Sequence, residues 1–106
     1  MIATTTPTIE GHTITKYYGV VTSEVIIGAN FIKDLVASFH DVFGGRSRDY
    51  EQVLAEAKGS AMLELQQRAG QLGANAVVGI DFDYETIGQS ASMLMVACSG
   101  TAVTID

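Results

Sequence analysis

The sequence predicts an α+β domain in which a small antiparallel sheet packs against one long helix and one shorter helix. Two segments in the middle of the chain repeat apolar residues at helical spacing, and three other segments have the composition of strands. The resulting order of strand, helix, helix, strand and strand is typical of this class. At 106 residues the chain has the length of one domain, 1–106, in which we expect residues 1–12 to form a poorly ordered N-terminal segment.

The composition excludes several classes of protein. Hydrophobic residues make up 47% of the chain and charged residues 17%, so it can bury enough apolar surface to fold. Twelve acidic and six basic residues give a net charge of −6, which provides no basic surface for nucleic acid or anionic membrane. The apolar stretches are shorter than the ~20 residues that span a bilayer, and no export signal is visible. We therefore expect a cytoplasmic protein that binds neither nucleic acid nor membrane.

The first strand and the shorter helix are predicted in the first half of the chain. Residues 13–27 are rich in Ile, Val and Tyr, which suit a pleated surface. Asn30 is a suitable N-cap for the helix that follows, and Gly44 and Gly45 end it. The apolar residues of this helix are Phe31, Ile32, Leu35, Val36, Phe39, Val42 and Phe43.

A longer helix is predicted from about Asp49 to Leu72. Its apolar stripe consists of Val53, Leu54, Ala57, Ala61, Leu65, Ala69 and Leu72, with Met62 beside it. Glu64 and Arg68 are four residues apart on the polar side, where such a pair stabilises a helix. Gly73 is a natural C-terminal stop.

Two further strands complete the predicted sheet. In residues 76–86 one face is expected to carry Ala76, Val78, Ile80, Phe82 and Tyr84, and the other Val77, Gly79, Asp81, Asp83 and Glu85. A turn around Gly88 leads to the last strand, 92–105, which is apolar on both faces. Such a strand is central in its sheet or lies at a subunit contact.

Several short motifs are distinctive in their type and order. They are Gly19-Val20-Val21, Gly28-Ala29-Asn30, Gly44-Gly45-Arg46-Ser47 with Tyr50-Glu51, Leu72-Gly73-Ala74-Asn75-Ala76-Val77-Val78-Gly79, Asp83-Tyr84-Glu85 and Gly100-Thr101-Ala102-Val103. From residue 14 to residue 105 the chain thereby resembles the YbjQ-like family of small bacterial and archaeal proteins, which often carries a heavy-metal-binding label. The resemblance implies a dodecin-like subunit that assembles into a ring-shaped homopentamer, and it implies no settled activity.

Soft metal ions prefer thiolate and imidazole ligands, of which this chain has Cys98, His12 and His40. No two of them are spaced as a metal motif. Cys98 lies in an apolar strand, where a buried and inert thiol is the more common outcome. The alternative is that ring symmetry brings one Cys98 from each subunit into a ring of soft ligands.

An acidic row is predicted on one face of the strand at 76–86. Asp81, Asp83 and Glu85 alternate along it and could share a hard cation such as Ca²⁺ or Mg²⁺. A solvated polar face is the more common reason for such a row. Carboxylates are in any case the wrong ligands for a soft heavy metal.

The segment Gly44-Gly45-Arg46-Ser47 precedes the long helix and is the best candidate for part of a ligand site. Backbone N–H groups at a helix N-terminus and a guanidinium both bind anions. The alternative is a tight turn in which Arg46 pairs with a carboxylate such as Glu24 or Asp41. We predict ligand binding by Arg46, Ser47, Glu24 and Asn75.

No enzyme signature is found, since G-x-S-x-G, H-E-x-x-H and G-x-G-x-x-G are absent. We expect a non-enzymatic homo-oligomer, without a cofactor, that binds a small anion, another small ligand or a metal ion at a symmetric or inter-subunit site. The alternatives are a structural or adaptor ring that recruits another protein, and an enzyme whose site is built between subunits.

Overall fold

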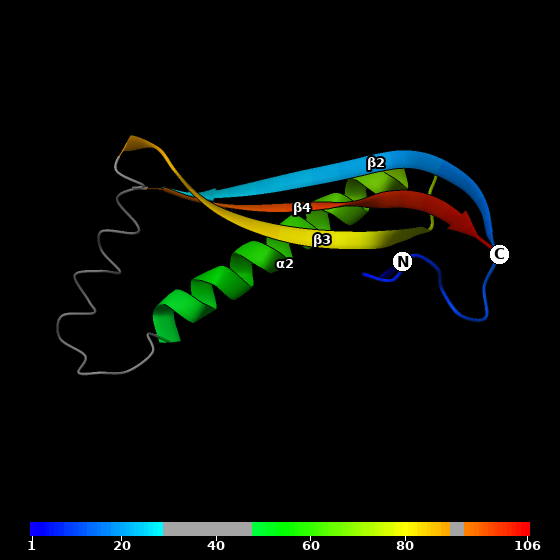
Figure 1. Cartoon of the computed structure of the whole chain (residues 1–106), viewed down its shortest axis with the longest axis horizontal. Helices are drawn as coiled ribbons and strands as arrows, with labels where there is room; N and C mark the ends of the chain where they lie inside the picture. Colours follow the sequence, from blue (N-terminus) through cyan, green and yellow to red (C-terminus); the bar gives the residue numbers. More distant parts are fainter. Residues whose placement is uncertain (29–47, 90–92) are drawn as a thin grey trace.

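The computed structural model describes residues 1–28, 48–89 and 93–106, and in these it has one helix and four strands (Figure 1). The elements are β1 (Ile2–Ala3), β2 (Ile14–Ile27), α2 (Arg48–Gln71), β3 (Ala76–Ile87) and β4 (Met93–Ile105). The strands form one sheet in the order β1-β3-β4-β2, and α2 crosses one face of it. The α+β class is confirmed. The predicted shorter helix at 31–43 lies outside the described residues.

The sheet is mixed, not antiparallel as predicted, because β1 lies in the segment to which the sequence assigned no element. Ile2 and Ala3 pair in parallel with the first two residues of β3, whereas the other strand pairs are antiparallel. Directly after β1, Thr4 N donates to Val77 O at 2.9 Å. A strand of two residues is too short to show a periodicity, which is why the sequence pattern did not indicate it.

Helix α2 begins and ends within one residue of its predicted bounds. Every fourth residue on one face is buried, namely Ala57, Ala61, Leu65 and Ala69. The chain leaves the helix at Gly73, whose φ is +99°, and Ala74 N donates back to Ala69 O at 3.1 Å. Leu72 lies beyond this end and is half exposed, so its predicted place in the apolar stripe is wrong. In the described part of the chain no helix is long and apolar enough to cross a membrane.

A β-bulge interrupts β3 at Gly79. The register with β4 shifts between Val78 and Asp81, where β3 has one residue more than its partner. Gly79 has a φ of +63°, a left-handed conformation that glycine adopts without the steric cost of a Cβ. The N-terminal segment holds the bulge from outside the sheet, because Gly79 N donates to Thr6 O at 2.9 Å.

Because of the extra residue, positions of the same parity before and after the bulge lie on opposite faces of β3. Val77 and Ile80, three residues apart, both pack against α2 in the main core. The predicted alternation therefore holds within residues 76–78 and within residues 80–86. The prediction that Ala76 and Val78 share a face with Ile80 is wrong, since strict period two does not allow for an extra residue.

Strand β4 lies between β3 and β2 and is buried on the side of α2, which confirms the prediction of a central strand. Its residues facing α2 are Leu94, Val96, Cys98, Gly100 and Ala102, and all are buried. On the opposite side of the sheet, the N-terminal segment packs Ile9 against a smaller cluster at one end, made of Ala76, Val78, Val103 and Ile105 with Ile14. We call the rest of that side the open face. It carries Thr22, Glu24 and Ile26 of β2, Met93, Met95, Ala97 and Ser99 of β4, and Asp81, Asp83, Glu85 and Ile87 of β3.

Close approach between β3 and β4 requires glycine at position 100. A Cβ there would lie 2.7 Å from Cγ1 of Val77 and 3.1 Å from Cγ1 of Ile80. We expect Gly100→Ala to lower the free energy of unfolding by about 1–3 kcal/mol through overpacking. As a control, Gly59→Ala in α2 meets nothing within 4 Å and should raise it by up to about 1 kcal/mol. Urea unfolding measures both, and a Gly100→Ala variant as stable as the unchanged protein would contradict the packing described.

Candidate functional site

Cys98 lies in the core between the sheet and α2. It is opposite Ser23 of β2 and Phe82 of β3, and only 2% of it is exposed. Burial, with a smaller contribution from the charge of Asp81, raises the pKa of its thiol. Because the thiolate is the form that binds metal, a buried thiol that stays protonated is a poor ligand. The structure therefore favours the core role for Cys98.

His12 lies beside the C-terminal end of β4, whereas Cys98 is in the middle of this strand. Its Nδ1 is 2.8 Å from the backbone oxygen of Asp106, and Thr13 N donates to a carboxylate oxygen of Asp106 at 2.9 Å. Eight residues of extended strand, about 27 Å, separate positions 98 and 106. The other candidate, His40, lies outside the described residues. In the part of the chain that the structure describes, no group of three or more His, Cys, Asp or Glu side chains could hold a metal ion.

The acidic row is present on the open face as predicted. Asp81, Asp83 and Glu85 are opposite Ser99, Ala97 and Met95 of β4, and all three carboxylates are exposed. The charge of Asp81 is the main cause of a raised pKa at Asp83, followed by partial desolvation, a hydrogen bond to Asp81 and the charge of Glu85. The row is thus a line of mutually repelling carboxylates.

Of the four residues predicted to bind a ligand, the structure describes Glu24 and Asn75, and it places these two far apart. Arg46 and Ser47 lie outside the described residues. Glu24 is exposed on the open face, opposite Ala97. Asn75 is at the far end of β4, where its side-chain amide donates to Ile105 O at 2.9 Å and accepts from Ile105 N at 2.7 Å. Both polar groups of Asn75 are occupied by the backbone of β4, which gives this residue a structural role.

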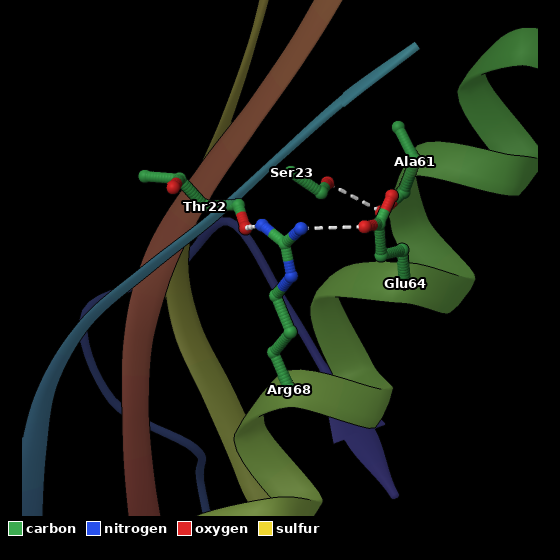
Figure 2. Close-up of polar contacts among 5 residues, drawn as sticks. All are labelled: Thr22, Ser23, Ala61, Glu64 and Arg68. Carbon is green, nitrogen blue, oxygen red and sulfur yellow. Dashed lines mark hydrogen bonds and ion pairs between the residues drawn. The ribbon is translucent and has the colours of Figure 1, made fainter.

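A polar anchor between α2 and β2 was missed by the sequence analysis (Figure 2). Ser23 is fully buried, and its hydroxyl donates to Ala61 O of the helix at 2.6 Å. About two turns further along the helix, Arg68 donates to Thr22 O and pairs with Glu64 at 2.6 Å. The predicted Glu64–Arg68 pair is confirmed. The guanidinium of Arg68 in addition binds α2 to the edge strand β2 through the backbone oxygen of Thr22.

One sequence signal for this anchor existed. Ser23 occupies an inward position between Val21 and Val25, in a strand rich in β-branched and aromatic residues, and a buried hydroxyl needs a partner. The partner is a carbonyl 38 residues away, which no local spacing indicates.

The fold and these sites can now be compared with known proteins. The chain matches over residues 1–106 the YbjQ family, described as "Putative heavy-metal-binding". It is also similar to a solved structure of a protein of unknown function from the DUF74 family of Pediococcus pentosaceus ATCC 25745, with a TM-score of 0.62 and 20% sequence identity. That match covers 100% of this chain and 98% of the other, and it supports the fold. The chain belongs to the YbjQ family.

The repulsion within the acidic row predicts that the stability of the folded protein depends on pH. Since the pKa of Asp83 is raised on folding, the folded state holds more protons than the unfolded state between the two pKa values. The contribution of Asp83 to the free energy of unfolding is therefore full below the pKa of the unfolded state, and it is lost as the pH rises through the pKa of the folded state. We expect Asp83→Asn to raise the melting temperature at about pH 7 and to leave it unchanged at about pH 3.

The control for this experiment is Glu56→Gln, an exposed carboxylate of α2. It should shift the melting temperature by less than Asp83→Asn at about pH 7. A lower melting temperature for Asp83→Asn at that pH would contradict the repulsion.

Proposed function

We propose that this protein is a non-enzymatic cytoplasmic homo-oligomer, a closed ring of five subunits whose sheets pair edge to edge and which binds a small ligand or ion between subunits. The observation that carries the proposal is the pair of open sheet edges. Within the described residues, β2 pairs only with β4, so one edge of a 14-residue strand has no strand beside it. The part of β3 that follows the bulge at Gly79 pairs with β4 on one side and, among the described residues, with no strand on the other, so it is an edge as well. Unpaired edges of this length associate with other strands unless they are protected.

The side chains of β2 support association. Val20 is 76% exposed, Tyr17 66% and Ile26 57%, so apolar groups line the strand with the unpaired edge.

The difference between the two edges supports a ring rather than a two-fold dimer. Pairing of β2 in one subunit with β3 in the next is a head-to-tail contact, which closes into a ring or continues as a fibre. The number five comes from the family resemblance.

Light scattering coupled to size exclusion tests the assembly. We expect a mass of five subunits for the unchanged protein. Val20→Lys places a charge on the edge strand and should shift the protein to smaller species. Leu63→Lys is the matched control, because Leu63 is 59% exposed on α2 and should leave the mass unchanged. A monomer peak for the unchanged protein would refute the ring, and a dimer or hexamer would refute the number five.

Calorimetric titration tests the metal label. We expect no sub-micromolar binding of zinc, copper or cadmium at neutral pH, because Cys98 is buried and its thiol stays protonated. Tight binding that is lost in Cys98→Ser would contradict this expectation and would favour a symmetric ring of thiols.

A further inference from the structure

The N-terminal segment passes round the outer edge of β3 and touches both sides of the sheet. Ala3 packs against the main core on the side of α2, whereas Ile9 packs against the smaller cluster on the opposite side. Between these two residues the chain crosses the edge of β3 beside the bulge. We call residues 2–9 the clasp. Figure 1 shows it in dark blue, next to the end of the sheet where β3 begins.

Backbone hydrogen bonds join the clasp to β3 beyond the two paired residues of β1. Thr4 N donates to Val77 O at 2.9 Å, and Thr4 O accepts from Ile80 N at 3.1 Å. Gly79 N donates to Thr6 O at 2.9 Å. The adjacent N–H groups of Gly79 and Ile80 thus both donate away from β4, because the bulge breaks the alternation of the ladder. The clasp satisfies both of these donors.

Side-chain hydrogen bonds within the clasp fix its shape. Thr6 N donates to Thr4 Oγ1 at 3.2 Å, and the hydroxyl of Thr6 donates to Thr8 O at 2.6 Å. Pro7, between Thr6 and Thr8, has no N–H group and cannot continue a ladder of strand hydrogen bonds. The clasp is therefore an ordered element whose pairing with β3 ends at Thr6.

The clasp divides the outer edge of β3 into two parts. Residues 76–80 are paired with β1 or bonded to the clasp. Residues 81–87 form the rest of β3, and among the described residues no strand lies beside their outer edge. This free part is shorter than β2, which has 14 residues. A β2 strand from a neighbouring subunit can therefore pair with β3 along only part of its length.

The direction of the strands places the clasp in competition with such a neighbour. β2 and β3 run in the same direction, because both are antiparallel to β4. A cyclic ring in which the sheet continues from one subunit to the next keeps this direction, so β2 of the neighbour lies parallel to β3. β1 is also parallel to β3. It occupies the edge in the orientation that the strand of a neighbour takes.

We propose that the clasp is a register stop, which closes the first part of the β3 edge so that β2 of a second copy pairs only with residues 81–87. This inference rests on the proposed edge-to-edge ring. A strand that slips by two residues keeps the same side chains on the same faces, so the pattern of side chains alone sets the register weakly. One register of a head-to-tail contact gives a ring of one size, whereas mixed registers give mixed sizes or fibres. The clasp makes the assembly uniform.

The test opens the clasp in the full chain. Thr4→Pro removes the N–H group that donates to Val77 O and places a proline ring at the paired edge. The double variant Thr4→Pro, Ile9→Ser also removes the apolar contact on the other side of the sheet. Thr8→Ala is the matched control, because it removes an exposed side chain of the clasp and none of the hydrogen bonds to β3.

Alanine methyl groups labelled with ¹³C report whether the clasp has opened. Ala3 packs against the core, so its methyl resonance should move to the position of an unfolded chain when the clasp opens. Ala61 is buried on α2, and its methyl resonance should stay in place while the rest of the fold is intact. An Ala3 resonance that does not move in the double variant would show that these contacts do not hold the clasp, and would overturn the proposal.

Light scattering coupled to size exclusion then measures the assembly. We expect one mass for the unchanged protein and for Thr8→Ala, and a mixture of masses for a variant with an open clasp. The same single mass with the clasp open would overturn the register stop and leave the ring standing. A monomer for the unchanged protein would instead refute the ring. In that case association on opening the clasp would support its role in closing the β3 edge, and a monomer with the clasp open would overturn that role as well.

Discussion

The pairing of β4 with a strand on each side is the constraint on which the rest of the described structure depends. β4 is opposite β2 over nearly all of its length and opposite β3 over most of it. This fixes which residues face α2, since the period of two carries the same alternation across the three strands except at the bulge of β3, where the faces reverse. It also makes β2 and most of β3 edge strands, because the two-residue β1 protects only the start of β3. The core, the open face and the two unpaired edges all follow from it.

The anchor of α2 has a related consequence. Ser23 and Thr22 lie on the edge strand β2. The Ser23 hydroxyl donates to the backbone oxygen of Ala61 in the helix, and the backbone oxygen of Thr22 accepts from Arg68 of the helix. The helix therefore fastens the outer strand to the domain. An edge strand that is held rigidly in this way is well suited to pair with a strand of another subunit, because little further ordering is needed on association.

Much of the fold could be predicted from the sequence, and the failures have definite causes. α2, β2 and β4 were found within about one residue because long segments show their periodicity clearly. The reversal of faces at Gly79 was missed because an inserted residue leaves no trace in composition, although an isolated glycine in a strand was a hint. Of the candidate site residues, the acidic row was located correctly, since it depends on strand period alone. The structural role of Asn75 was not foreseen, because its partner Ile105 is 30 residues away.

The central claim is that the free edges of β2 and β3 pair between copies of this chain, and amide hydrogen exchange of the native protein tests it most directly. Backbone amides of β2 alternate between those that donate to β4 and those that point to the free edge. The account predicts that both sets are protected in the assembled protein, and that the outward set loses its protection when dilution or Val20→Lys releases smaller species. Fast exchange of the outward amides in the intact assembly, with slow exchange of the inward ones, would contradict it.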